Sequence, residues 1–164
     1  MNFAYKSGLE MHYKKIPPKV IAEEYIENNG GNLFDYKVHC FSGKAMYIQY
    51  IGGRATDTTH EGWFDRDWNL LSFTDGCYPK YDSNIPKPKN LHELLSLSEK
   101  LASPFSYVRV DFYVLNDGSF KFGEMTFTPA SGIHNWFSDG DLKPEEVDLM
   151  LGELITLPPC NGAN

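Results

Sequence analysis

Apolar and polar residues alternate along two neighbouring stretches of the chain, Asp35–Phe41 and Ala45–Ile51. Alternation with a period of two is typical of a β-strand that buries one of its faces. The Ser-Gly-Lys segment at 42–44 between them consists of residues that favour a turn. We therefore predict two antiparallel strands joined as a hairpin.

A second hairpin is predicted over the stretch from Tyr107 to Pro129. Its turn is Asn-Asp-Gly at 116–118, and the Asp-Gly pair favours a two-residue loop of the primed type. A loop of that length places Asp111 directly opposite Glu124 and Arg109 opposite Thr126. Side chains opposed in this way point to the same face, with Cβ atoms roughly 5 Å apart.

The two carboxylates of this hairpin, Asp111 and Glu124, are thus expected side by side among the rings of Tyr113, Phe120 and Phe122. Like charges at that separation are unfavourable, more so in apolar surroundings. A shared proton, a nearby Arg or Lys, or a divalent cation would compensate, and the hairpin alone leaves all three open.

Three segments have the features of helices. Leu91–Ala102 follows Asn90, a residue that favours the N-cap, and Glu93 stands three residues after it. Pro144 begins a last helix, with acidic residues in its first turn. Ala4–Lys14 is predicted as a short helix that two prolines terminate. The apolar face of the last helix is predicted to consist of Val147, Leu151, Leu154 and Ile155.

The remaining segments complete the predicted fold. Lys19–Ile26 is interpreted as a strand leaving the core, 52–62 as a mobile polar loop and 74–89 as irregular. The order is hairpin, long loop, helix, hairpin, helix, which indicates an α+β fold with a mainly antiparallel sheet and flanking helices on one side. We expect a single domain over 1–156 and a disordered tail over 157–164.

Composition narrows the class of protein. The chain has 164 residues, 41% of them hydrophobic, which suffices for one domain with a core. Its net charge of −7 argues against a general nucleic-acid binder. The cysteines Cys40, Cys77 and Cys160 show no CxxC spacing, which favours reduced thiols in a cytoplasmic protein. We expect no signal peptide and no transmembrane segment, because no apolar run approaches the ~20 residues of a spanning helix.

The acidic pair of the second hairpin is the first candidate for chemistry. Asp111 and Glu124, with the hydroxyl of Thr126, offer the oxygen ligands that Mg²⁺ prefers. On the same face, Arg109 would meet charge that develops on a transferring phosphoryl group. The alternative is a surface-exposed acidic pair neutralised by Arg109 and Lys121, and residue spacing alone does not distinguish this alternative from a metal site.

A strand end before the first hairpin is the second candidate. Backbone groups at a strand end can bind an adenine edge, and a carboxylate there can bind ribose hydroxyls. Ordinary solvated acids are the alternative. The residues concerned are Glu23, Glu24, Tyr25 and Ile26.

Two isolated cationic side chains give weaker evidence for a functional site. Lys37 suits a phosphate as a point charge, or is an exposed strand lysine. Arg54 is a candidate catalytic residue that would bind an acidic substrate, or is an ordinary exposed loop residue. We interpret three further polar residues as ordinary parts of the fold: His39, Gln49 and His134.

Taken together, these motifs resemble the ATP-grasp enzymes, and most closely the TupA-like ATP-grasp family. RVDFYVLNDGSFKFGEMTF is similar to the metal-binding hairpin of that superfamily, and IAEEYI to the hinge strand that carries the nucleotide base. DYK, the Asp-Trp-Asn segment at 67–69 and PEEVDLMLGEL extend the resemblance over about residues 5–155. The family is associated with teichuronopeptide and other cell-surface polysaccharide synthesis, and its members are often labelled glycosyltransferases.

The resemblance implies ATP-dependent ligation of a carboxylate through an acylphosphate, with an acidic saccharide or peptide as substrate. By motif, Asp111 and Glu124 would hold Mg²⁺ and Arg109 would stabilise the transferring group. Residues 23–26 would hold adenine and ribose, and Lys37 would lie near the phosphates.

Two departures qualify what the resemblance implies. Thr126 stands where the wider superfamily usually has Asn, which leaves the third metal ligand open. An upstream subdomain with a lysine strand and a glycine-rich loop has no counterpart, so we expect a carboxyl-terminal portion: a fragment, a truncated gene product, or one chain of a split protein whose other half is a separate chain. The alternatives are a glycosyltransferase that uses a nucleotide sugar and a truncated, non-catalytic nucleotide-binding remnant.

Overall fold

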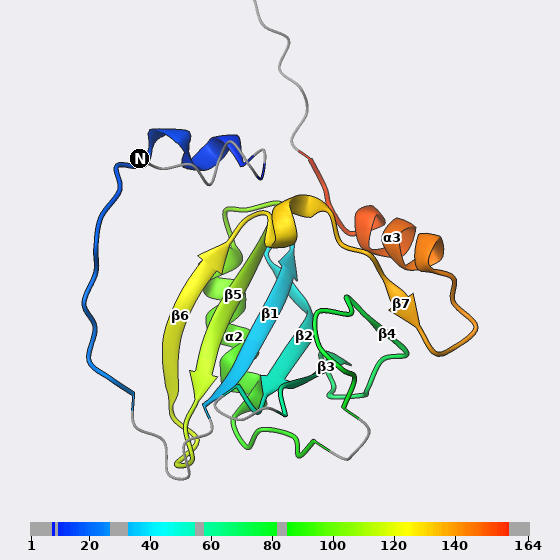
Figure 1. The fold of residues 1–164 in the computed structure, drawn as a ribbon, viewed down its shortest axis with the longest axis horizontal. Helices are drawn as coiled ribbons and strands as arrows, with labels where there is room; N and C mark the ends of the chain where they lie inside the picture. The colour runs from blue at the N-terminus through cyan, green and yellow to red at the C-terminus, as the bar shows by residue number, and fades with distance from the viewer. Residues whose placement is uncertain (1–7, 9, 27–32, 55–57, 82–84, 158–164) are drawn as a thin grey trace, which may run out of the picture.

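The computed structural model describes residues 8, 10–26, 33–54, 58–81 and 85–157. A five-stranded sheet with the order β3-β2-β1-β5-β6 forms its centre, and each neighbouring pair is antiparallel (Figure 1). Its strands are β1 (Phe34–Phe41), β2 (Lys44–Gly52), β3 (His60–Asp65), β5 (Tyr107–Val114) and β6 (Phe120–Thr126).

The other elements surround this sheet. The short strands β4 (Phe73–Thr74) and β7 (Phe137–Ser138) pair with each other. The helices are α2 (Leu91–Ala102), α3 (Pro144–Glu153) and the 3₁₀ turns η1 (Met11–Lys15) and η2 (Pro129–Gly132). None of the helices in the described part of the chain is long and apolar enough to cross a membrane.

One face of the sheet is apolar and packs against α2. Alternate residues of the strands, such as Val38, Ile48 and Val110, are fully buried against Leu94 of the helix. Figure 1 shows α2 behind β5 and β1. Because strand side chains alternate between faces, this packing sends the intervening, mostly polar residues to the opposite face.

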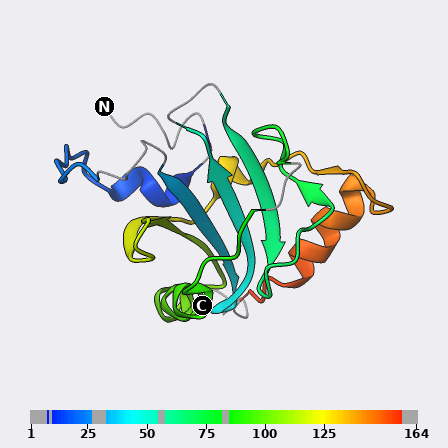
Figure 2. The same cartoon turned by 90° about the horizontal axis from the view of Figure 1, so that it is seen from below.

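The opposite face is covered by α3 and by the β4–β7 pair. Val147 and Leu151 of α3 form a second apolar cluster with Phe41, Trp63 and Phe73. In Figure 2 the sheet separates α2 from α3, so the helices lie on both sides of the sheet instead of on one side as predicted. The α+β class and the mainly antiparallel sheet are confirmed.

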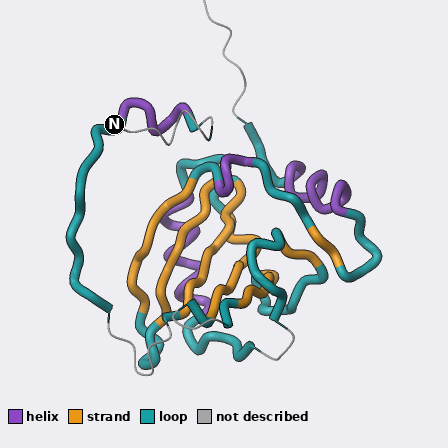
Figure 3. Tube along the Cα trace, in the orientation of Figure 1, coloured by secondary structure: helices purple, strands orange, loops and turns teal. Residues whose placement is uncertain are grey.

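Two segments differ from the sequence prediction. Lys19–Ile26 is not a strand: residues 16–26 run as an irregular segment beside the edge of β6 (Figure 3). Residues 60–62, predicted within a loop, belong to β3, where backbone pairing with β2 and with Pro79 and Tyr81 orders them. The first residues of the predicted N-terminal helix and most of the predicted tail lie outside the described residues.

The β5–β6 hairpin has the predicted pairing of Arg109 with Thr126 but reaches it by another route, and Asp111 lies opposite a bulge instead of pairing directly with Glu124. Leu115 and Ser119 close a three-residue loop, with Gly118 at a φ of 85°. That loop shifts the register by one residue, and a bulge opposite Asp111 shifts it back. Arg109 therefore faces Thr126 as predicted.

The bulge also divides the hairpin into two parts with different faces. Phe122 pairs with Phe112, at 6.2 Å between ring centroids, so it shares a face with the α2 core. Phe120 packs on the same core. The prediction that Phe120 and Phe122 flank the carboxylates is therefore wrong, because it assumed one continuous register.

Gly118→Ala tests the three-residue loop. An L-residue is strained at this positive φ, so we expect a loss of about 1–2 kcal/mol in the free energy of unfolding. Gly152→Ala is the matched control: a Cβ at this α3 position meets nothing within 4 Å, and we expect a gain of up to about 1 kcal/mol. Urea denaturation measures both, and a Gly118→Ala protein as stable as wild type would contradict the loop geometry.

Candidate functional site

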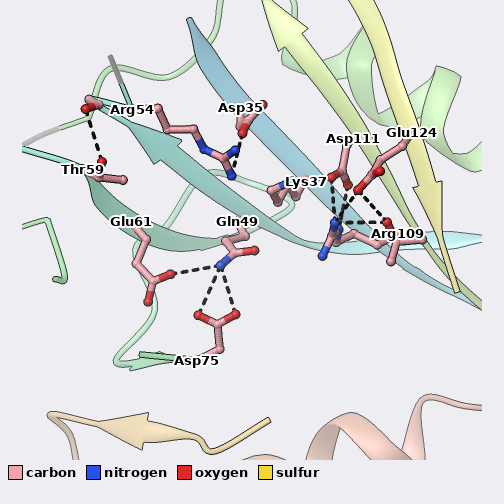
Figure 4. Close-up of polar contacts among 12 residues, drawn as sticks. Asp35, Lys37, Gln49, Arg54, Thr59, Glu61, Asp75, Arg109, Asp111 and Glu124 are labelled. Atoms are coloured by element: carbon pink, nitrogen blue, oxygen red, sulfur yellow. Dashed lines mark hydrogen bonds and ion pairs between the residues drawn. The ribbon is translucent and has the colours of Figure 1, made fainter. Parts of the chain in front are cut away.

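A layer of charged and polar side chains lies across the face of the sheet opposite α2 (Figure 4). It arises from local alternation: on β1, Asp35, Lys37 and His39 point to this face because Tyr36, Val38 and Cys40 point to the core. In the sheet, Lys37 pairs with Gln49 of β2 on one side and with Asp111 of β5 on the other. The buried polar residues of this layer are Asp35, Lys37, His39, Gln49, Glu61, Asp75 and Asp111.

Asp111 is the centre of this layer and is only 4% exposed. Its carboxylate accepts a hydrogen bond from Lys37 Nζ and two from Arg109, at 2.7 Å from Nε and 2.8 Å from Nη2. Burial alone would lower the pKa of Arg109, but the hydrogen bonds and charge of Asp111 raise it above its usual value. Asp111 thus makes charge-assisted hydrogen bonds to two cationic side chains in a buried position.

Arg109 connects Asp111 to β6. Its Nη2 also donates to Glu124 Oε1 and to Thr126 Oγ1, both at 3.1 Å, and the Thr126 hydroxyl donates to Glu124 at 3.0 Å. The Glu124 side chain is 63% exposed, so this end of the network faces solvent. The sequence left three ways to offset the repulsion between Asp111 and Glu124 open, and the structure shows the nearby cations Lys37 and Arg109.

The oxygen atoms of this network are suitable ligands for a hard cation. Asp111, Glu124 and Thr126 contribute carboxylate and hydroxyl oxygens, the ligand type of Mg²⁺. With Lys37 and Arg109 counted, the formal charge of the network is zero. A divalent ion would consequently enter most favourably together with an anionic group such as a polyphosphate.

A second buried polar group lies beside the first. Gln49 Nε2 donates to Glu61 Oε2 at 3.0 Å and to both oxygens of Asp75, at 3.3 and 3.2 Å, and Thr74 Oγ1 donates to Glu61. Burial, together with a hydrogen bond to Asp75, raises the pKa of Glu61 to about 8. Glu61 is therefore mostly protonated at neutral pH.

Asp75 also belongs to a group with metal-ligand chemistry. Asp75, Cys77 and His134 each offer one ligand atom, all within 4.8 Å of one another. Burial and the neighbouring Asp75 raise the pKa of the Cys77 thiol to about 11. The thiol is thus protonated, and a cation would have to displace that proton to bind there.

Arg54 joins the layer at its edge. Its Nη2 lies 3.0 Å from Asp35 Oδ2, and the arginine side chain is 46% exposed whereas Asp35 is buried. Burial raises the pKa of Asp35, and the nearby cations Lys37 and Arg54 oppose that effect. Arg54 is therefore anchored by a buried acid while part of its guanidinium faces solvent.

Residues 23–26 lie in a different place from the charged layer. They line a groove of about 720 Å³ together with Leu115, Lys121 and Phe122 at the β6 edge. Tyr25 is 85% exposed. The structure thus brings together Lys37, Arg109, Asp111, Glu124 and Thr126, and places the predicted base-binding residues in a separate groove.

The sequence prediction did not include Gln49, Glu61 and Asp75 among the site residues. Gln49 was interpreted as an ordinary sheet residue, and the other two stood in segments interpreted as irregular. The available signal was the polar positions of the alternating strands, since Gln49 continues the polar face of β1 on β2. Whether that face is solvated or covered depends on β4, β7 and α3, which no local pattern specifies.

Glu61→Gln tests the buried proton through the pH dependence of stability. The unfolded chain ionises Glu61 near its ordinary pKa, whereas the folded chain keeps the proton to about pH 8, so stability falls as pH rises through this window. Gln49 and Thr74 can still donate to the amide oxygen, and the amide can donate to Asp75. We expect the variant to gain stability relative to wild type between pH 5 and 8, on the order of a few kcal/mol. Urea unfolding at several pH values measures this gain, and the exposed Glu93→Gln on α2 is the control. A stability difference between Glu61→Gln and wild type that does not change with pH would contradict the buried proton.

Comparison of the sequence with protein-family models gives a match over most of the chain. The TupA-like ATPgrasp family matches residues 2–156 of the chain. Comparison with curated proteins and with solved structures gave no significant match. The match spans the whole described fold, including the buried charged layer, and it supports an ATP-grasp-type function with ATP and a divalent metal in general terms. The chain belongs to the TupA-like ATPgrasp family.

Proposed function

We propose that the chain binds Mg·ATP at the buried charged layer and takes part in ATP-dependent carboxylate ligation in cell-surface polysaccharide or teichuronopeptide synthesis. The observation that carries this proposal is the network around Asp111, in which a buried acid fixes two cations beside an exposed acid. Structural ion pairs are rarely this deeply buried, because removing charges from water is costly. The family match supplies the expectation of ATP.

The residues have distinct roles in this proposal. Lys37 and Arg109 would bind phosphate oxygens, Lys37 as a point charge and Arg109 through its planar guanidinium. Asp111 holds both in position before the nucleotide arrives, which lowers the cost of organising the site on binding. Asp111, Glu124 and Thr126 would hold Mg²⁺, which neutralises charge on the phosphates when bound.

The base and the acidic substrate would lie at the two edges of this layer. The groove of residues 23–26 contains Tyr25 and Phe122, which offer ring surfaces to an adenine, and Glu23 and Glu24, which offer acceptors to ribose hydroxyls. Arg54, half exposed and held by Asp35, offers a cation to a substrate carboxylate.

The proposed reaction has two steps. A substrate carboxylate oxygen attacks the γ-phosphorus of ATP, the bond to the bridging oxygen breaks, and ADP leaves. An amine then attacks the carbonyl carbon of the acylphosphate, inorganic phosphate leaves, and the amine nitrogen loses a proton. In the first step Arg109 would stabilise the charge on the transferring group, since it already donates to several oxygens at the site.

A calorimetric titration with Mg·ATP tests the site. We expect Glu124→Gln to weaken binding roughly tenfold, because it removes one charged ligand of the cation. Glu124 is the preferred position because its exposed ion pair contributes only about 0–1 kcal/mol to stability, so the variant folds. Asp111→Asn is expected to weaken binding further, and its fold is checked by circular dichroism because it breaks a buried pair.

The matched control is Glu93→Gln, which removes an exposed acid from α2 on the far side of the sheet. It should bind Mg·ATP as wild type does. Equal binding by wild type, Glu124→Gln and Glu93→Gln would contradict the assignment. Release of ADP and phosphate only when a carboxylic acid is added would support the ligase reaction, whereas turnover of a nucleotide sugar would contradict it.

A further inference from the structure

A partly open pocket lies beside the charged layer and plays no part in the proposed nucleotide site. This pocket of about 360 Å³ lies between the sheet, residues 127–136 and α3. Aromatic rings make up most of its wall, and a volume above roughly 300 Å³ is within the range of small-molecule sites. Its lining includes His39, Trp63, Tyr107, His134, Trp136 and Leu151.

Three buried ring nitrogens among the described residues have no hydrogen-bond partner, and all three belong to this lining. They are His39 Nε2, Trp63 Nε1 and His134 Nε2. His39 is 5% exposed and Trp63 is 1% exposed. A buried polar group without a partner costs about 1–3 kcal/mol, so three of them around one cavity indicate a missing polar occupant.

The rings that carry these atoms form a continuous wall. The ring centroids are 4.6 Å apart for His39 and Trp63, and 5.4 Å apart for Trp63 and Trp136. His134 continues the wall, with its centroid 5.4 Å from that of Trp136. An occupant that contacts Trp136 is therefore within reach of polar atoms on either side.

The hydrogen-bonding character of the wall defines the occupant. Trp63 Nε1 can only donate. His134 Nδ1 lies 3.5 Å from Asp75 Oδ2, a neighbour that favours a proton on Nδ1, and we therefore assign Nε2 as the acceptor. His39 Nδ1 is engaged by the Tyr107 hydroxyl at 2.9 Å, so its Nε2 is the free position of that ring.

The rings that carry these three nitrogens are uncharged, and the charged Asp148 of the lining is exposed on α3. Burial, and then the nearby Arg109 and His134, lower the pKa of His39 well below its usual value. Burial lowers the pKa of His134 as well, although Asp75 opposes this. Neutral histidines and an indole favour a neutral ligand over an anion or a cation.

We propose that this pocket binds a neutral ring that carries at least one hydroxyl group. The hydroxyl oxygen accepts from Trp63 Nε1–H, and a hydroxyl proton is donated to His134 Nε2. The ring packs against Trp136 and Tyr107, as flat apolar surfaces do in aromatic pockets. A phenolic ring and a saccharide ring share this chemistry. The proposal requires no nucleotide and stands apart from the proposed ligase function.

The test uses the indole N–H signals in a ¹H–¹⁵N spectrum of the full chain, which has three tryptophans. Trp63→Phe and Trp68→Phe identify the signals of the two residues. The probes are p-cresol, toluene and methyl β-D-glucopyranoside, and the first two differ by one hydroxyl group. We expect p-cresol or the glucoside to shift the Trp63 signal, toluene to shift it far less, and the Trp68 signal to stay in place.

Affinity measurements then separate binding from folding. Trp63→Phe keeps the ring and removes the donor, and should weaken binding of the hydroxylated probe roughly tenfold. Trp68→Phe is the matched control, because its N–H donates to Ile85 outside the pocket, and its affinity should equal that of wild type. A Trp63 signal that no probe shifts, toluene binding as tightly as p-cresol, or equal effects of the two substitutions would overturn the proposal. A shift by p-cresol alone identifies a phenolic ligand, and a shift by the glucoside alone identifies a saccharide.

Discussion

The ionic contact of Asp111 with Lys37 and Arg109 is the constraint on which this side of the protein depends. Burying one carboxylate with two cations is tolerable only when each charge has a partner, because an uncompensated buried charge costs about 3–5 kcal/mol. The sheet provides the partners by register: Lys37 pairs with Asp111 across β1 and β5, and Arg109 lies two residues earlier on the same strand. β6 pairs with β5, and Arg109 extends the ionic contact to Glu124 and Thr126 on that strand.

A proton network next to this ionic network completes the polar layer. Asp75 helps to raise the pKa of Glu61, and Gln49 donates to both carboxyl groups. Gln49 also lies opposite Lys37 in the sheet, so the two networks are joined through β1 and β2. Beyond Asp75, His134 leads to the aromatic pocket. The charged layer, the proton network and the pocket are thus consecutive parts of one face, from the solvent-exposed Glu124 to the enclosed rings.

The sequence was sufficient to predict the elements whose pattern is local. The alternation at 35–41, the helix at 91–102 and the Arg109–Thr126 pairing are all present in the structure. The hairpin loop was wrong by one residue, and a bulge corrected the error, because loop length and bulges depend on packing as well as on turn residues. The covered state of the polar face could not be predicted, since the packing of α3 on the sheet depends on residues distant in sequence, and β4 and β7 are strands of two residues each. For the same reason Asp75 carried no recognisable signal, and the polar position of Gln49 on β2 did not by itself indicate a buried site, whereas Asp111 and Glu124 stood out as an acidic pair.

A double-mutant cycle on Lys37→Met and Asp111→Asn tests the central claim most directly. The structure predicts a coupling energy of about 1.5–3 kcal/mol from urea unfolding, since Asp111→Asn leaves Lys37 buried without its anion and Lys37→Met removes one of the two cations that hold Asp111. The same cycle on the more exposed pair Lys80 and Asp139, 2.6 Å apart, should give at most about 1 kcal/mol. A coupling between Lys37 and Asp111 below about 0.5 kcal/mol, the range of independent sites, would contradict a charged layer organised around Asp111.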